Sequence, residues 1–311
     1  MPTKNPDPPA ARVLLGADVG GSHTTVAVGR PPAGIVGRAQ GPGAAMRPGG
    51  GTRSAVIIGE TTRRAAAAAG VRLPADAMVV GAAGAGREAE RVELARALER
   101  AGIAAEVRIV MDVEVALRAA FGRGPGILLN AGTGSIAVAH DSQGVLRRAG
   151  GYGWQLGDEG GGYWLGRRAL AAVGRAQDAR GDAGGLPQRL LGALGLTSFD
   201  DLVAWSTIAT PAQVAQLATE VLAAARDGDP AAGALLAQSA RELASLIHAL
   251  ERWFAANTEV PVVLAGGLLI PSAPLRAQVR DAVALLMPRA QFREGDLDPV
   301  AGALELAAEM S

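Results

Sequence analysis

Twice along this chain an apolar run ends in a polar, glycine-rich turn and then resumes as a second alternating run. The first copy reads VLLGADVGGSHTTVAV at residues 13–28, and the second reads ILLNAGTGSIAVA at residues 127–139. Alternation on both sides of a short glycine-containing turn is typical of a β-hairpin. At 311 residues the chain is longer than a single hydrophobic core usually grows, so we expect each hairpin to belong to its own domain.

The residues after each hairpin follow the same order in both halves. A third strand completes a meander, and strands and amphipathic helices then alternate. A capping residue precedes proline at Thr210-Pro211, Asp229-Pro230 and Asp298-Pro299, which predicts three helix starts. The expected strands are 13–19, 23–29, 35–39, 77–82, 106–111, 126–131, 134–140, 144–149 and 260–267, and the expected helices are 53–69, 87–101, 113–121, several within 163–257, 272–286 and one ending at 310. The halves therefore repeat a structure without repeating a sequence.

The composition excludes several kinds of chemistry. The chain has no cysteine, its only lysine is Lys4, and it has three histidines. Thiol nucleophiles, iron–sulfur clusters and a phosphate-binding or Schiff-base lysine are therefore excluded, and a histidine-based metal site is poorly supplied. Carboxylates, hydroxyls, backbone amides and arginines remain for any reaction.

The charge balance indicates small-molecule partners. Thirty basic residues match thirty acidic ones, so no nucleic acid or anionic membrane partner is expected. No apolar run approaches the roughly 18–20 residues of a membrane span, and the opening MPTKNPDPPAA lacks the apolar core of a secretory signal. We therefore expect a cytoplasmic protein.

The two turns have a functional and a purely structural interpretation. Exposed N–H groups at hairpin tips can bind phosphate, and two tips facing one ligand would hold a chain of phosphates. Asp18 would then bind Mg²⁺ through water, because that ion loses its hydration shell reluctantly. Both turns are equally well explained as ordinary hairpins. The string GTGSIA fits a dinucleotide fingerprint in letters only, since a strand pattern rather than a helix follows it.

The segments GADVGGSHTT, LLNAGTGSIAVA and, at 149–166, AGGYGWQLGDEGGGYWLG resemble the phosphate-1, phosphate-2 and sugar-site segments of the N-acetylglucosamine kinase / BadF-type ATPase family. That family belongs to the actin–hexokinase–Hsp70 superfamily, and the resemblance extends from about residue 13 to 310. It implies an α/β fold of two ribonuclease-H-like, actin-like ATPase domains flanking a cleft. One domain would comprise residues 12–121 with 298–311, and the other residues 122–297 with a helical insertion.

The resemblance implies an ATP-dependent kinase that phosphorylates a hydroxyl of an amino sugar, of the N-acetylglucosamine, glucosamine or N-acetylmuramate type, with ATP and Mg²⁺ as cofactors. It makes Asp112 the catalytic base and Asp18 the magnesium residue. From the residues alone, a helix N-cap is the favoured interpretation of Asp112 at this strand-to-helix junction. The implied ATP-binding residues are Gly20, Gly21, Ser22, Thr24, Gly132, Thr133, Gly134, Gly266 and Gly267.

The same resemblance implies a sugar site. Its residues would be Asp112, Ser135, Gly151, Tyr152, Gly153 and Asp158, with Glu159 only a brace. Independently of any ligand, acids placed ahead of a helix that begins near residue 161 also interact favourably with the helix dipole.

One departure from the family concerns the substrate. Ala45 stands where relatives carry an asparagine that contacts the sugar, and Arg47 is a hypothetical partner for an anionic group such as a lactyl carboxylate. The alternative functions are a BadF-type ATPase and a non-catalytic sugar or nucleotide sensor, although the lack of cysteine argues against an ATPase that carries an iron–sulfur cluster. The helical region 163–257 offers enough surface for a homodimer.

Overall fold

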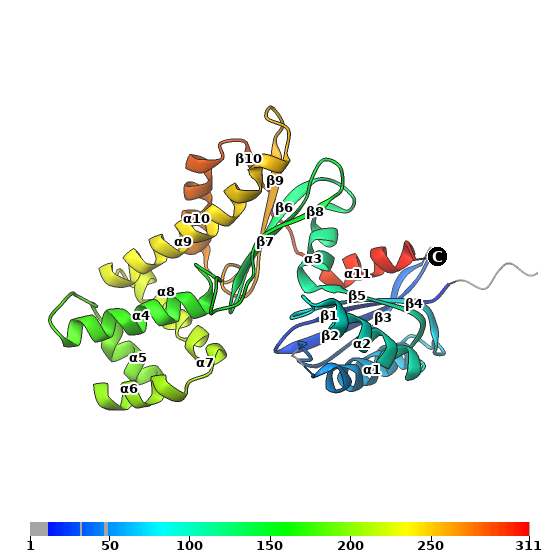
Figure 1. Cartoon of the computed structure of the whole chain (residues 1–311), viewed down its shortest axis with the longest axis horizontal. Helices are drawn as coiled ribbons and strands as arrows, with labels where there is room; N and C mark the ends of the chain where they lie inside the picture. The colour runs from blue at the N-terminus through cyan, green and yellow to red at the C-terminus, as the bar shows by residue number, and fades with distance from the viewer. Residues whose placement is uncertain (1–11, 32, 47–48, 311) are drawn as a thin grey trace, which may run out of the picture. The chain divides into compact units, whose positions relative to one another are not determined.

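The computed structural model describes residues 12–31, 33–46 and 49–310, which form two compact units. Unit 1 consists of the described residues within Met1–Gly122 and Asp296–Ser311, and unit 2 is Arg123–Gly295. Each unit is built on one five-stranded sheet (Figure 1). None of the helices in the described ranges combines the length and the apolar content that crossing a membrane requires.

The sheet of unit 1 is an antiparallel meander extended by two parallel strands. Its elements are β1 (Leu14–Val19), β2 (His23–Arg30), β3 (Gly34–Pro42), α1 (Gly51–Ala68), β4 (Ala75–Ala82), α2 (Glu88–Arg100), β5 (Ala104–Met111), α3 (Asp112–Phe121) and α11 (Pro299–Ala308). The strands lie in the order β3-β2-β1-β4-β5. Alternation buries both faces: Leu15 packs with Ile58 and Leu94 of α1 and α2, whereas Leu14 packs with Leu304 of α11. Figure 1 shows these helices on opposite sides of the sheet.

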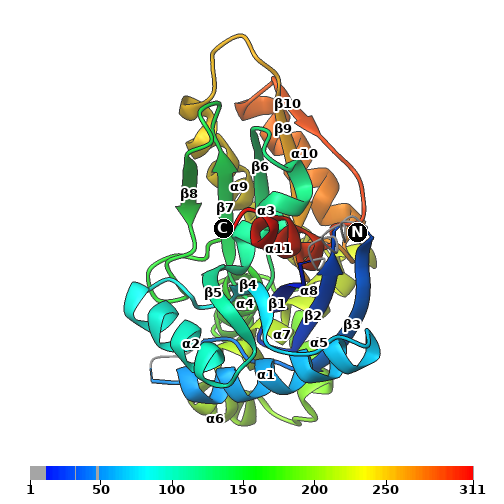
Figure 2. The same ribbon diagram turned by 90° about the vertical axis from the view of Figure 1, so that its right-hand side faces the viewer.

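The sheet of unit 2 has the same plan. Its elements are β6 (Gly126–Ala131), β7 (Ser135–His140), β8 (Leu146–Gly150), α4 (Gly162–Gln177), α5 (Leu186–Leu194), α6 (Phe199–Ile208), α7 (Pro211–Gln216), α8 (Ala218–Arg226), α9 (Pro230–Leu250), η1 (Glu251–Trp253), β9 (Val260–Ala265), α10 (Ala273–Leu286) and β10 (Ala290–Phe292). The strand order is β10-β9-β6-β7-β8, and Figure 2 shows these strands side by side. Ile127 and Leu129 of β6 pack with Leu165, Val221 and Leu243 from α4, α8 and α9 in one core.

The expected fold class, two α/β halves that each begin with a three-stranded meander, is confirmed. Each half continues as predicted, with strands that pair parallel to the first strand of the meander or to one another. Strand β10 was not predicted. Its three residues are too few to show an alternating pattern, and its pairing with β9 defines it as a strand.

All three predicted helix starts are confirmed, and two of the three capping residues also bind the helix through their side chains. Thr210 accepts the N–H of the third residue of its helix, and Asp229 accepts the N–H of Ala232 at 2.9 Å. Asp298 precedes α11, but its carboxylate makes no capping hydrogen bond and pairs with the guanidinium of Arg38 on β3. Asp298 therefore occupies the N-cap position of α11 as predicted, whereas its carboxylate binds a charged partner from β3.

Helices α3 and α11 are in unusually close contact. A β-carbon on Gly302 of α11 would lie 2.1 Å from the Val115 carbonyl oxygen of α3. Beside this contact the buried guanidinium of Arg118 donates to Glu305 at 2.9 Å and also pairs with Glu309. Because α3 begins at Asp112, these contacts fix the position of that carboxyl group relative to the sheet.

We expect Gly302→Ala to destabilise unit 1 by about 1–3 kcal/mol, since the added methyl overlaps backbone atoms that cannot move aside. Urea unfolding followed by circular dichroism measures the change. Gly233→Ala in α9 is the matched control, because a β-carbon there meets nothing within 4 Å. It should leave stability unchanged or raise it by up to about 1 kcal/mol. Equal effects of the two variants would contradict the close helix contact.

Candidate functional site

The β1–β2 turn is held by the segment that follows β3. The carbonyl of Gly20 accepts the N–H groups of Ala44 and Ala45, both at 3.1 Å. A β-carbon on Gly43 would lie 2.0 Å from the Gly21 carbonyl oxygen, so only glycine permits this approach. The turn is therefore fixed through its carbonyl groups, and Ala45 contributes its backbone rather than a polar side chain.

The four residues predicted to bind phosphate here differ in their surroundings. Gly21 and Ser22 are exposed, and nothing lies within 4 Å of a β-carbon built on Gly21. Thr24 is fully buried, and its hydroxyl donates to the Pro42 carbonyl at 2.8 Å. The Thr24 side chain therefore ties β2 to β3. The N–H of Gly20 donates to the His23 carbonyl at 2.9 Å, so the part of the hairpin open to a ligand is Gly21 and Ser22.

Two carboxyl groups lie at the ends of β1 and β5, two parallel strands of one sheet that are separated by β4. Asp18 is the penultimate residue of β1, and Asp112 directly follows β5. The carboxyl ends of parallel strands lie at one edge of a sheet, which is where ligands bind in open α/β folds. The pKa of Asp18 is raised to about 6, chiefly by burial and also by the carboxylates of Asp112 and Asp298, against a lowering by His23.

Asp112 is the first residue of α3, and the N-cap position belongs to Met111. The Asp112 carboxylate accepts the N–H of Val113 at 3.0 Å, whereas the N–H of Met111 donates to Glu114 at 3.0 Å. Burial raises the pKa of Asp112, and the hydrogen bond from Val113 lowers it. The structure therefore does not support the reading of Asp112 as an N-cap, and among the described residues its carboxyl group is hydrogen-bonded to the backbone of Val113.

Asp298 is a third carboxylate that acts on Asp18, and the sequence did not predict it near this site. It lies near enough to raise the pKa of Asp18, and its own charge is matched by Arg38. No local pattern could have found it, because Asp18 and Asp298 lie near opposite ends of the chain and meet only in the folded sheet.

The carboxylates of unit 1 suit Mg²⁺ better than a metal that needs several protein ligands. Among the residues that the structure describes, no three His, Asp or Glu side chains gather as a metal centre. Magnesium usually takes one or two carboxylates and completes its shell with water and substrate phosphates. A divalent cation beside Asp18 would also relieve the repulsion from Asp112 that raises the pKa of Asp18.

In unit 2 the β6–β7 hairpin is hydrogen-bonded to the start of α4. The carbonyls of Gly132 and Thr133 accept the N–H groups of Gly162 and Tyr163 at 2.8 and 2.9 Å. These two donors belong to the first turn of the helix, where backbone N–H groups have no partner within the helix. The hairpin and the helix are thus joined by main-chain bonds.

Asp158 lies against the tip of the same hairpin. A β-carbon on Gly134 would stand 2.2 Å from a carboxylate oxygen of Asp158. The backbone of Asp158 has a φ of 64°, a conformation that residues other than glycine adopt infrequently. Burial raises the pKa of Asp158, whereas the N–H groups of Gly153 and Ser135 lower it. The acid predicted to bind the sugar therefore touches a hairpin predicted to bind phosphate.

Ser135 and Tyr152 were both predicted to contact substrate, but their exposure differs. Ser135 is 3% exposed, and its hydroxyl donates to the Glu159 carbonyl at 2.7 Å. Tyr152 is 60% exposed. Gly151 and Gly153 have φ values of 72° and 87°, so glycine on each side lets the chain turn and present the tyrosine ring. The Ser135 hydroxyl thus fixes the loop that carries Glu159, and the exposed Tyr152 ring provides a surface on which a ligand can bind.

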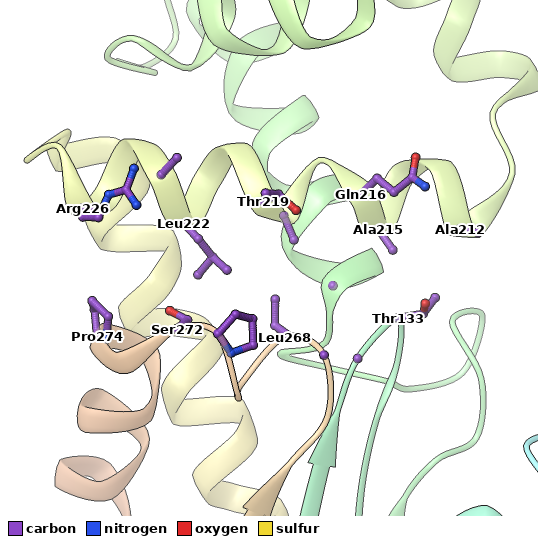
Figure 3. A pocket seen from close by; sticks show the side chains of 16 residues that line it. Thr133, Ala212, Ala215, Gln216, Thr219, Leu222, Arg226, Leu268, Ser272 and Pro274 are labelled. Carbon is purple, nitrogen blue, oxygen red and sulfur yellow. The ribbon is translucent and has the colours of Figure 1, made fainter. Parts of the chain in front are cut away.

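A cavity of about 570 Å³ lies beside the second hairpin (Figure 3). Gly132, Thr133 and Gly267, three of the residues predicted to bind ATP, line it. Gly266 has a φ of 100°, and a β-carbon there would lie 2.2 Å from the Ala131 carbonyl oxygen. Gly266 therefore supports the turn after β9, and Gly267 faces the cavity.

The sequence analysis missed the opposite wall of this cavity. Helices α7 and α8 form it in Figure 3, with lining residues that include Ala212, Ala215, Gln216, Thr219, Leu222 and Ala223. Their spacing of three and four residues places them on one helix face. This spacing is visible in the sequence, but a helix face that packs into a hydrophobic core has the same spacing. The small side chains leave space here, and Arg226 stands at the end of the row.

The predicted site residues thus form two sets, one in each unit. Unit 1 holds Asp18, Gly20, Gly21, Ser22, Thr24 and Asp112, and unit 2 holds Gly132, Thr133, Gly134, Ser135, Gly151, Tyr152, Gly153, Asp158, Gly266 and Gly267. Arg47, the hypothetical partner of an anionic group, lies outside the described residues.

The sequence signature of the BadF/BadG/BcrA/BcrD ATPase family matches residues 15–307. The chain is 30% identical over 234 residues to a protein of Clostridium acetobutylicum named N-acetylmuramic acid/N-acetylglucosamine kinase, covering 74% of this chain and 76% of that protein. It is 31% identical over 187 residues to the N-acetyl-D-glucosamine kinase of Dictyostelium discoideum, covering 58% and 59%. A solved structure from Chromobacterium violaceum, described as a candidate N-acetylglucosamine kinase, is 32% identical with a TM-score of 0.80, covering 96% of this chain and 100% of that one.

Asp18→Asn should change how stability depends on pH. The pKa of Asp18 is about 6 when folded and near the ordinary 3.8 when unfolded, so the folded state binds the extra proton between these values. Its stabilising contribution is complete below about pH 4 and is lost as the pH rises through about 6. In Mg²⁺-free buffer the melting temperature of the wild type should therefore fall relative to that of D18N over this range.

The exposed acid Asp178, whose side chain is 57% exposed, provides the control for this titration. Asp178→Asn should give a pH profile of melting temperature parallel to that of the wild type. A parallel profile for D18N as well would contradict the raised pKa of Asp18.

Proposed function

Because this chain belongs to the BadF/BadG/BcrA/BcrD ATPase family, we propose that it is an ATP-dependent kinase that transfers the γ-phosphoryl group to a hydroxyl of an amino sugar. The observation that carries this proposal is the Asp112 carboxyl group, which is held at the start of α3 beside Asp18 with a pKa above its usual range. The names of the relatives, which are kinases of N-acetylglucosamine and of N-acetylmuramic acid, supply the substrate class.

Asp112 is the general base in this proposal. Its carboxylate accepts the proton of the sugar hydroxyl as the hydroxyl oxygen bonds to the γ-phosphorus. The bond from that phosphorus to the oxygen bridging to the β-phosphate breaks, and ADP leaves with the electron pair. Phosphoryl transfer depends mostly on positioning and charge stabilisation, so a weak base such as a carboxylate is sufficient. The raised pKa of Asp112 also brings this base nearer to the working pH.

The phosphates are assigned to the two hairpins, and Mg²⁺ to Asp18. When bound, the ion would neutralise charge on the transferring group. Gly21 and Ser22 are exposed in unit 1, and Gly132 and Thr133 line the unit 2 cavity. That cavity has the size of a nucleoside site and would take the adenosine. Thr24 is left out of the direct contacts because its hydroxyl already donates to Pro42.

The sugar is assigned to the loop that carries Tyr152 and Asp158. An exposed ring flanked by Gly151 and Gly153 suits the apolar face of a pyranose, and the half-buried Asp158 carboxylate is an acceptor for its hydroxyls. Ser135 enters this proposal through its backbone, since its hydroxyl donates to Glu159. The homodimer and the cytoplasmic location expected from the sequence remain predictions.

An ADP-release assay tests the reaction directly. Purified protein with ATP and Mg²⁺ is given glucosamine, N-acetylglucosamine, N-acetylmuramate, glucose or no sugar. Release that depends on an amino sugar supports the kinase. Equal release without sugar would favour an ATPase, and ATP binding without release would favour a sensor.

We expect Asp112→Asn to lower turnover by about 100-fold or more while ATP binding stays intact, because an amide of the same shape cannot accept the proton. Steady-state kinetics and a nucleotide titration measure the two properties separately. Near-normal turnover would remove Asp112 from the role of base.

Gly134→Ala should raise the KM for the sugar, since its methyl would occupy the space of the Asp158 carboxylate. Gly132→Ala is the matched variant, because a β-carbon there meets only the Gly267 nitrogen at 3.9 Å. We expect the sugar KM of G134A to rise about tenfold and to exceed that of G132A. The opposite ranking would show that Asp158 does not hold the sugar.

A further inference from the structure

Strand β8 carries two adjacent arginines with different surroundings. Arg147 donates to Asp141 at 3.0 Å, and its guanidinium carbon lies 3.8 Å from the centre of the Trp253 ring. Its side chain is 28% exposed. Asp141 is buried and also accepts the N–H groups of the turn that precedes β8. Arg147 therefore has a structural role, in which it ties β8 to that turn and to η1.

Arg148 has none of these partners. It is the next residue on the strand, so its side chain leaves the opposite face of the sheet. Arg148 is exposed, and its guanidinium carbon lies 4.9 Å from the centre of the Tyr152 ring. In the part of the chain that the structure describes, Arg148 forms no ion pair, and its guanidinium stacks beside the Tyr152 ring. A guanidinium without an acidic partner is thus held beside the ring assigned to the sugar.

The charges of the sugar loop show what such a cation would do. Asp158 and Glu159 are consecutive acids, and the charge of Glu159 raises the pKa of Asp158. A neutral sugar can donate hydroxyl hydrogens to these acids, but a sugar that bears a carboxylate would be repelled by them. Binding an anionic sugar on this loop therefore requires a positive charge close to the ring, and Arg148 supplies one.

We propose that Arg148 is the specificity-determining residue for amino sugars that bear a carboxylate, whose ring lies on Tyr152 and whose carboxylate binds the Arg148 guanidinium. This inference rests on the proposed function, because it takes Tyr152 as the sugar surface. The planar guanidinium presents paired N–H donors that match the two oxygens of a carboxylate, and stacking on the tyrosine ring fixes its plane. Arg148 recognises the substituent and takes no part in phosphoryl transfer.

The test compares two probes that differ in the carboxylate, N-acetylmuramate and N-acetylglucosamine. kcat/KM for each is measured with the full chain of the wild type, Arg148→Ala, Arg148→Lys and Arg168→Ala. Arg168 is the matched control, since its guanidinium carbon lies 5.0 Å from the ring centre of Trp164 on α4 and it has no assigned role in binding. Calorimetric binding of both sugars to each variant provides a readout that does not need turnover.

We expect R148A to lower the ratio of kcat/KM for N-acetylmuramate over N-acetylglucosamine by about tenfold or more, as for the loss of a hydrogen-bonded charge pair. R148K should retain part of the ratio, because it keeps the charge and loses the paired donors, and R168A should match the wild type. An unchanged ratio in R148A would overturn the proposal. An equal loss for both sugars would overturn it too, by showing that Arg148 only orients Tyr152.

Failure of the kinase proposal gives a different result. A wild type that phosphorylates none of the sugars in the ADP-release assay refutes the kinase, and the calorimetric ratio then still reports on Arg148. Selective weakening of N-acetylmuramate binding in R148A supports the carboxylate contact even in that case. Wild-type binding of N-acetylglucosamine without detectable binding of N-acetylmuramate overturns it.

Discussion

Close approach of one backbone to another, at positions without a β-carbon, is the constraint on which both candidate ligand surfaces depend. In unit 1, Gly43 lies against the carbonyl of Gly21, and in unit 2 a β-carbon on Gly161 would stand 2.7 Å from the Gly134 carbonyl carbon. Such contacts let main-chain hydrogen bonds fix each hairpin through its carbonyl groups. The glycine tips thus keep a defined shape through main-chain contacts, which a backbone that binds phosphate requires.

A second constraint is electrostatic. The edge of the unit 1 sheet gathers Asp18, Asp112 and Asp298, and burial together with mutual repulsion raises the pKa of Asp18 to about 6. A folded protein gains nothing in stability from such an arrangement, and acids in this state are typical of functional sites. The pairs of the buried Arg118 with Glu305 and Glu309 have the opposite character, because each charge there is matched and the helix that begins at Asp112 is fixed.

The parts of this fold that were predictable are those with a local signal. Alternation around short glycine turns marked both hairpins, and proline after a capping residue marked the starts of α7 and α9. The resemblance of three glycine-rich segments to segments of a kinase family identified the candidate site residues that lie in each unit. Local patterns were ambiguous where the same spacing fits both a core face and a cavity wall. The small-residue face of α7 and α8 has the spacing of a core face but lines a cavity.

The sequence by itself determined the two repeated α/β halves, the absence of thiol and lysine chemistry, and the family to which the chain belongs. Only the tertiary structure decided which polar groups are available to a ligand. The hydroxyls of Thr24 and Ser135 donate to carbonyl oxygens, and the Asp298 carboxylate pairs with Arg38 instead of capping α11. Arg148, rather than Arg147, has the Tyr152 ring as its contact. The physical reason is that a side chain's partners are set by strand pairing and helix packing between distant segments. Residue type and local spacing define what a group can bind, and the fold defines what it meets.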